Sequence, residues 1–341
     1  MRMALDPNVW EECHFLIWHD MNHNSFRSLF IVLVPFLLCF QAGTAPMTAG
    51  KEAPKVYADT IPAPPGWRYF DGDEFDGGSP KPTHWKLYGA PDVGNAAYGQ
   101  GRQQMIQTYR PEQVTMHTLP TGERICRITS VKGRDAPTPR PPVADKIGWW
   151  SGALSSRDAG KFYPLYCRME IRAKVPNVEG VWHAFWNRFF QGALIAELDI
   201  QEFFVKEQGL NVLSQSTHLY HAESRTTSIN IPRRQNRHFA VSDPGNTFHV
   251  YGVQIDPDPE HPDEVIISYL LDGKINYSFS TNSLPGHNKF VMEAKKGQLD
   301  SAWDMAITGQ IGGEWVGFPA DSVTKVVTEI DWFRCFVRNE N

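Results

Sequence analysis

The chain has 341 residues and a formal net charge of -5 at pH 7. This length allows one large β domain or two small ones, and the slight acidity gives no reason to expect a nucleic-acid partner. The sequence contains no glycine-rich phosphate loop and no zinc-type spacing of Cys and His. It is rich in aromatic residues, with 11 Trp, 11 Tyr and 20 Phe. Such a composition suits a protein that binds sugars, because aromatic rings stack on pyranose faces.

The N-terminal region has the pattern of an export signal. An apolar run at residues 29–40 follows Arg27 and precedes a small-residue cleavage site at 43–45. The run is too short for a stable membrane-spanning helix, which needs ~20 residues. Acidic residues before position 21 are unusual in such a signal, so we expect translation to start at Met21. We therefore expect a leader at residues 1–45 and a secreted or periplasmic protein with no membrane span after signal removal.

The rest of the chain reads as one β domain. Residues 46–65 are rich in proline and are expected to form a linker or an extended arm. From Trp67 onward, short β-patterned segments alternate with turn residues, for example at 154–157, 168–173, 250–255 and 265–270. No long stretch of the sequence shows the 3.6-residue apolar repeat of a helix. This pattern predicts an all-β sandwich or jelly roll at residues 66–341, and we expect it to be a monomer.

Three carboxylates, Glu197, Asp199 and Glu202, fall in a stretch of six residues, and this stretch is part of an apolar, β-prone segment. A regular strand places Glu197 and Asp199 on one face and Glu202 on the other, because strand side chains alternate. One β-bulge between Asp199 and Glu202 would bring all three to the same face. Two carboxyl groups about 5–5.5 Å apart are what retaining glycoside hydrolysis requires.

The pattern Glu-x-Asp-x-x-Glu follows Gly-Val-Trp-His-Ala-Phe-Trp at residues 180–186. Together they resemble glycoside hydrolase family 16, which includes laminarinases, lichenases, agarases, porphyranases and κ-carrageenases. Further matching segments run in the family's order at 70–77, 151–156, 166–176, 248–252, 271–273, 312–317 and 331–334. The resemblance implies a concanavalin A-like jelly roll of two curved antiparallel sheets, with a polysaccharide substrate in a concave cleft.

The resemblance also implies roles for the carboxylates. Glu197 matches the nucleophile, Glu202 matches the general acid and base, and Asp199 is expected to hydrogen-bond Glu197. Like-charge repulsion between neighbouring carboxylates is expected to raise the pKa of Glu202. Catalysis of this kind needs no cofactor. A structural Ca²⁺ is a second expectation of the resemblance, with Asp331 as a ligand.

Candidate substrate-binding residues flank the carboxylates. Trp182 and Trp186 share one strand face, and the family position of Trp186 contacts sugar, although either ring could belong to the core. His183 points to the opposite face and is expected to be structural or exposed. His218 matches a position near the acceptor side, with a structural histidine as the alternative. Arg188 is a further candidate for the cleft lining.

The substrate is left open because a family motif is missing. Many members carry Trp-Pro-x-x-Gly before the nucleophile, whereas this chain has Phe-Phe-Gln-Gly-Ala-Leu-Ile-Ala at 189–196. We expect a β-1,3-glucan or a mixed-linkage β-1,3/1,4-glucan, and a β-galactan of the agar, porphyran or carrageenan type is the alternative. The arginine-rich loop at 225–237 would bind an anionic polysaccharide, or is simply a solvated loop. Two further classes stay open on the same fold, a transglycosylase and a non-catalytic glycan-binding protein.

Three cysteines follow the leader: Cys126, Cys167 and Cys335. Each lies in an apolar or alternating segment, which favours buried free thiols. One disulfide with one free thiol is the alternative for an exported protein.

Overall fold

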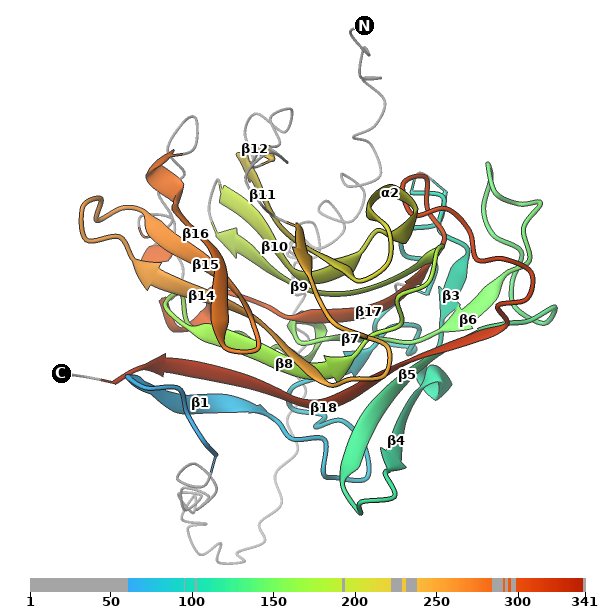
Figure 1. The fold of residues 1–341 in the computed structure, drawn as a ribbon, viewed down its shortest axis with the longest axis horizontal. Coiled ribbons are helices and arrows are strands. Elements are labelled where there is room, and N and C mark those ends of the chain that lie inside the picture. The colour runs from blue at the N-terminus through green and yellow to red at the C-terminus, as the bar shows by residue number, and fades with distance from the viewer. Residues whose placement is uncertain are drawn as a thin grey trace, which may run out of the picture. The chain divides into compact units, whose positions relative to one another are not determined.

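The computed structural model describes residues 61–339 except 95, 102, 192–193, 222–228, 231–237, 284–290, 292–293 and 296–298. The leader, the Met21 start, most of the proline-rich segment and nearly all of the arginine-rich loop lie outside the described residues. From Pro62 onward the chain forms one compact unit. Two stacked sheets confirm the predicted all-β jelly roll (Figure 1). The described part of the chain contains no helix that is long and apolar enough to cross a membrane.

The first sheet has ten strands, all antiparallel to their neighbours except at β3–β6. Its order is β16 (Lys274–Ser280), β15 (Val265–Leu271), β14 (His249–Pro257), β8 (Arg168–Lys174), β18 (Lys325–Arg338), β5 (Arg124–Lys132), β6 (Trp149–Ser151) and β3 (Gln107–Tyr109), with β1 (Trp67–Asp73) on β18 and β4 (Val114–Thr118) on β5. The predicted segments at 168–173, 250–255 and 265–270 are confirmed as strands of this sheet.

The second sheet has eight strands and carries the Trp and carboxylate motifs in its middle. Its order is β12 (Ile229–Asn230), β11 (Val212–His221), β10 (Leu194–Phe203), β9 (Val181–Gln191), β17 (Ala306–Ile311), β7 (Ala153–Ser155) and β2 (Lys86–Leu87), with β13 (His238–Ala240) also on β11. Helical turns are short: α2 (Val205–Gln208), η2 (Pro111–Gln113), η3 (Arg157–Ala159), η4 (Thr281–Ser283) and η5 (Leu299–Ser301).

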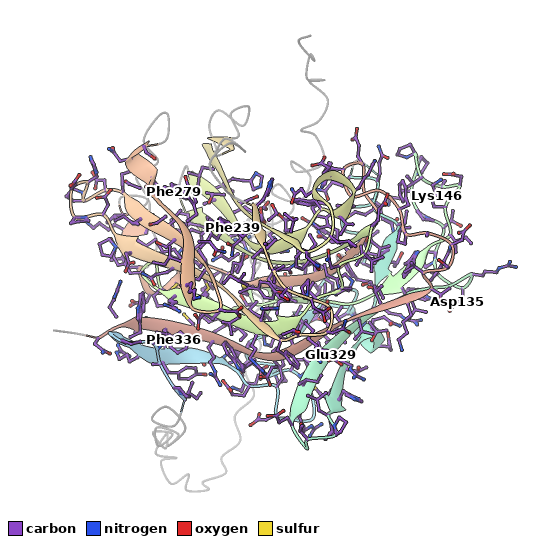
Figure 2. All side chains as sticks on the ribbon, viewed as in Figure 1. Asp135, Lys146, Phe239, Phe279, Glu329 and Phe336 are labelled. Carbon is purple, nitrogen blue, oxygen red and sulfur yellow. The ribbon has the colours of Figure 1, made fainter. Side chains whose placement is uncertain are left out.

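The core lies between the two sheets, where side chains fill the space (Figure 2). Alternate residues of β9 and β10 enter it, among them Phe185, Phe189, Leu198 and Ile200. They meet apolar residues of the first sheet such as Phe333. Because strand side chains alternate, the residues between them point to the other face of the eight-stranded sheet, called the outer face below.

His183 is buried on the core side of its strand, so the structural one of its two expected roles is confirmed. It is 2% exposed. Its ring nitrogens hydrogen-bond the hydroxyls of Ser130, at 2.9 Å, and Thr328, at 2.6 Å. Burial lowers its pKa to about 3, so the ring is neutral.

The cysteine prediction is also confirmed. Cys126, Cys167 and Cys335 are free and fully buried. Burial in apolar surroundings raises the pKa of the Cys126 thiol, which makes it inert.

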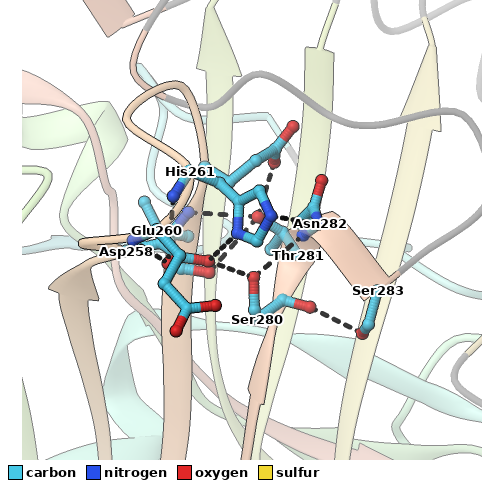
Figure 3. Close-up of polar contacts among 9 residues, drawn as sticks. Asp258, Glu260, His261, Ser280, Thr281, Asn282 and Ser283 are labelled. Carbon is cyan, nitrogen blue, oxygen red and sulfur yellow. Dashed lines mark hydrogen bonds and ion pairs between the residues drawn. The ribbon is translucent and has the colours of Figure 1, made fainter.

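A polar cluster joins the end of β14 to the end of β16 (Figure 3). The Asp258 carboxylate accepts hydrogen bonds from the backbone N–H groups of Glu260, at 2.9 Å, and His261, at 3.2 Å. It also contacts the His261 ring, at 3.1 Å, and the Ser280 hydroxyl. The Asn282 amide donates to His261 Nε2 at 2.7 Å. These bonds fix the loop between two strands at one edge of the first sheet.

Candidate active site

A β-bulge in β10 brings the three carboxylates together, as the sequence predicts. Asp199 lies opposite Ser216 of β11, and Glu202 lies opposite Ser214. Three steps along β10 thus match two steps along β11, and the register shifts between Asp199 and Glu202. The extra residue turns Glu202 back to the outer face, which Glu197 and Asp199 already share.

Glu197, Asp199 and His218 form a tight polar group. One side-chain oxygen or nitrogen atom from each of the three residues lies within 4.8 Å of the other two. His218 Nε2 is 3.0 Å from Asp199 Oδ2. Glu197 lies between two cationic or basic neighbours, because Arg188 of β9 and His218 of β11 are directly opposite it. The structure therefore brings two of the predicted binding residues beside the predicted nucleophile.

The electrostatics of the site centre on Glu197. Burial, and then the charge of Asp199, raise the pKa of Glu197 to about 7, while His218 and Arg188 act in the opposite direction. The structure thus gives Glu197 a raised pKa, and the raised pKa expected for Glu202 stays a prediction. The Glu197 side chain therefore changes from a neutral acid to a carboxylate as the pH rises through about 7.

Trp182 orients Glu202. Its indole N–H donates to Glu202 Oε1 at 2.7 Å, and the two residues are 7% and 6% exposed. The Trp182 ring is packed against Trp315, with centroids 5.3 Å apart, and against Phe204. Trp182 is packed like a core residue and also touches a site carboxylate. Contact between Trp182 and a sugar stays a prediction.

Trp186 lies two residues from Arg188 on the same strand face. It is 4% exposed, because Tyr98 stacks on it with centroids 6.3 Å apart and an interplanar angle of 24°. Its indole N–H donates to Thr308 Oγ1 at 3.1 Å, and the Arg188 guanidinium lies 4.8 Å from its ring. Contact between Trp186 and a sugar stays a prediction, and it would require Tyr98 to move.

An ion-pair network around the buried Asp304 lies beside Glu197. Asp304 has no exposed side-chain surface and meets Arg188, at 2.8 Å, and Arg157, at 3.0 Å. Burial opposes the charge of Arg188, but the Asp304 carboxylate outweighs it and raises the pKa of Arg188 above its ordinary value. Sequence reasoning missed Asp304, and the signal was available: an acidic residue in the apolar segment Ala-Trp-Asp-Met-Ala at 302–306.

Asp331 lies apart from this group, in the first sheet on β18. Its carboxylate forms an ion pair with Arg172. A cation at the same oxygen would require that guanidinium to turn away. Ca²⁺ binding at Asp331 stays a prediction.

The segment without the Trp-Pro motif belongs to the paired strands β9 and β10. β9 continues to Gln191 and β10 begins at Leu194, and these two residues are paired. The ladder runs from this end to the bulge without an inserted loop in its described part. Residues 189–196 contain no tryptophan.

Comparisons with known proteins agree with this geometry. The model of a family described as glycosyl hydrolases family 16 matches residues 102–332. A β-glucanase of Rhodothermus marinus is 24% identical over 288 residues, which cover 79% of this chain and 86% of that protein. SCLam, a non-specific endo-β-1,3(4)-glucanase of this family, has a similar structure, with a TM-score of 0.57 and 21% identity over 82% of this chain and 94% of SCLam.

Another similar structure comes from a study of endo-acting O-glycanases that prominent human gut bacteria use to initiate mucin breakdown. Its TM-score is 0.59, with 20% identity over 82% of this chain and 93% of that one. At this identity the likeness shows the fold alone.

The family match covers more than half of the chain, so the protein belongs to glycoside hydrolase family 16. It is a glycosidase that hydrolyses glycosidic bonds, of the endo-β-glycanase class.

Proposed function

We propose that this protein is an exported endo-β-glucanase that cleaves β-1,3 or mixed-linkage β-1,3/1,4-glucan with retention of configuration. The observation that carries the mechanism is the bulged strand β10, which turns Glu197, Asp199 and Glu202 to one face. The names of two relatives, a β-glucanase and an endo-β-1,3(4)-glucanase, support a glucan substrate. The tyrosine and tryptophan rings near the site support a neutral pyranose chain.

The proposed reaction is a double displacement. Ionised Glu197 attacks the anomeric carbon and forms a glycosyl-enzyme, while Glu202 gives its proton to the leaving oxygen. Glu202 then takes a proton from water, which attacks the same carbon and releases Glu197. The Trp182 N–H fixes the direction of Glu202 during both steps. His218 and Arg188 offset part of the cost of a buried negative charge at Glu197.

The test is reducing-end release by the domain from Ala45 onward on laminarin, mixed-linkage β-glucan, agarose, porphyran and κ-carrageenan. Glu197→Ala and Glu202→Gln are the matched controls. We expect release from a glucan by the wild type alone, with the β-anomer formed first in an NMR time course. An α-anomer formed first would contradict retention, and unchanged turnover by Glu197→Ala would contradict the site.

A sulfated β-galactan is the second candidate substrate. The observation that favours it is the Arg188 guanidinium opposite Glu197, with that of Arg157 on the same Asp304 carboxylate, because arginine binds sulfate through a planar fork. Release from porphyran or κ-carrageenan alone would select this candidate. A transglycosylase would use the same carboxylates, and it would yield products longer than the substrate.

Export, a monomeric state and a structural Ca²⁺ at Asp331 are further parts of the proposal. The apolar run after Arg27 supports export. N-terminal sequencing of the mature protein tests it, because an intact leader would contradict it. Unfolding with and without EDTA tests the calcium site, with Asp331→Asn as the control.

A further inference from the structure

Arg188 and Glu197 are neighbours on adjacent strands, but the guanidinium of Arg188 is held by a third residue. The two lie directly opposite each other in the ladder of β9 and β10. Opposite residues share a face, with Cβ atoms about 4.5–5.5 Å apart. An arginine side chain can span that distance and bind a carboxylate through its planar fork. Arg188 therefore has the reach to form a direct ion pair with Glu197.

Asp304 binds the fork of Arg188. The Asp304 carboxylate accepts a hydrogen bond from Arg188 Nε at 3.0 Å and meets Nη2 at 2.8 Å. It also accepts from the Arg188 backbone N–H at 2.8 Å, and the Asp304 backbone N–H donates to the Arg188 carbonyl at 2.9 Å. These contacts tie Asp304 to one residue of β9 and give the Arg188 side chain a fixed direction.

Two further groups stabilise this pair. Arg157 Nε donates to Asp304 Oδ2 at 3.0 Å, so a second guanidinium favours the ionised form of the Asp304 carboxylate. The Arg188 guanidinium lies 4.8 Å from the Trp186 ring, which attracts it. The side chain of Asp304 is fully buried and that of Arg188 is 15% exposed. Because solvent ions screen such a pair only weakly, its attraction is stronger than that of a surface pair.

Charged or titratable groups face Glu197 from each element beside it. These groups are Asp199 and Glu202 on β10, Arg188 on β9, His218 on β11, and Asp304 in the segment before β17. Burial, and then the Asp199 charge, raise the pKa of Glu197 to about 7, against the smaller opposing effects of His218 and Arg188. A directly bound guanidinium would pull that pKa down, because an opposite charge within ~4–6 Å lowers it by about 1–3 units. The raised pKa therefore agrees with an Arg188 that lies near Glu197 while Asp304 holds its fork.

We propose that Asp304 is a positioning residue for hydrolysis, which holds the Arg188 guanidinium beside Glu197 and prevents the two from forming a direct ion pair. The inference rests on the proposed function, in which Glu197 attacks the anomeric carbon. A carboxylate oxygen that binds a guanidinium has less electron density to give to carbon, so a direct pair would weaken the nucleophile. In this role Asp304 contacts neither the sugar nor the reacting atoms and acts only through Arg188.

The first test is a double-mutant cycle on the titration of Glu197, which needs no enzyme activity. NMR follows isotopically labelled glutamate carboxyl groups, and Glu197→Gln assigns the signal. In Arg188→Met the midpoint should rise by about one pH unit, because a nearby positive charge is lost. In Asp304→Asn it should fall by about one unit or more, because Arg188 then pairs with Glu197.

The double variant decides how Asp304 acts. In the Arg188→Met background, adding Asp304→Asn should move the midpoint by less than about half a unit. A fall of equal size in both backgrounds would mean that Asp304 acts on Glu197 through its charge alone, and this result overturns the proposal. A midpoint that stays or rises in Asp304→Asn overturns it as well.

The second test is the same cycle on kcat with laminarin, taken at the plateau of each pH profile. Asp304→Asn alone should lower kcat about tenfold to hundredfold, because a charged hydrogen bond to the nucleophile must first break. With Arg188→Met present, the same change should cost less than about threefold. General damage to the fold would lower kcat equally in both backgrounds, and that outcome contradicts the proposal. The exposed Asp321→Asn is the control and should leave kcat unchanged.

Arg188→Lys replaces Asp304→Asn if that variant does not fold. Lysine keeps the charge but lacks the fork that Asp304 binds, so its ammonium can approach Glu197. The Glu197 midpoint should then fall below that of the wild type, and an equal or higher midpoint overturns the proposal.

Failure of the proposed function gives a different result, because wild-type protein would then hydrolyse no glucan. The titration cycle still reports whether Asp304 keeps Arg188 from Glu197. The expected titration in an inactive protein would reject the glucanase activity alone, whereas an active protein with equal shifts in both backgrounds would reject the role of Asp304 alone.

Discussion

Glu197→Gln tests whether the partly buried Glu197 destabilises the fold when it ionises. In the native protein Glu197 holds its proton up to a pKa of about 7, against an ordinary value of 4.5. Between these pH values the unfolded chain binds fewer protons than the native protein, so native stability falls as the pH rises. A difference of about 2.5 pH units corresponds to about 3 kcal/mol. Glutamine keeps the shape and removes the charge.

The assay is urea unfolding followed by tryptophan fluorescence between pH 4 and pH 8. We expect the variant to gain stability relative to wild type as the pH rises, by up to about 3 kcal/mol at pH 8. A changed hydrogen bond would shift the variant's free energy of unfolding by the same amount at every pH. The difference between the pH 4 and pH 8 values removes that shift. Glu112→Gln, at an exposed site in η2, is the matched control. A stability difference that is the same at pH 4 and pH 8 would refute the reasoning.

Three further changes test the neighbours of the nucleophile. Asp199→Asn removes the charge that helps to raise the pKa of Glu197, so the acid limb of kcat/KM, near pH 7 in the wild type, should move to lower pH; a limb that stays or rises contradicts this. Trp182→Phe keeps an aromatic ring but loses the N–H that orients the acid, and kcat should fall about tenfold with little change in KM. Asp304→Asn leaves two partly buried guanidinium groups without their carboxylate and should cost about 3 kcal/mol in urea unfolding, the lower end of the range for a buried pair. The exposed Asp321→Asn is its control, with a cost below about 1 kcal/mol.

The parts of the molecule that sequence predicts are those set by local rules. Alternation of apolar residues predicts the strands, and a five-residue spacing between Glu197 and Glu202 requires a bulge if both serve one cleft. The opposite direction of His183 follows from the same period. These features need only neighbouring residues along one strand.

The parts that sequence does not predict depend on partners far along the chain. Tyr98, which stacks on Trp186, lies almost ninety residues earlier in the sequence. That separation is roughly half the length of a domain. Asp304, in the segment before β17, contacts Arg188 although the two residues are 116 positions apart in the sequence. The raised pKa of Glu197 also depends on burial, which composition does not reveal.

The absence of cross-links among the three buried thiols has a practical consequence. Cys126, Cys167 and Cys335 are fully buried and free, so folding of the described domain requires no oxidation step. The domain is therefore suited to production in a reducing cytosol without a disulfide isomerase. The same thiols are a built-in probe of unfolding, since an alkylating reagent reaches them only when the β-sandwich opens.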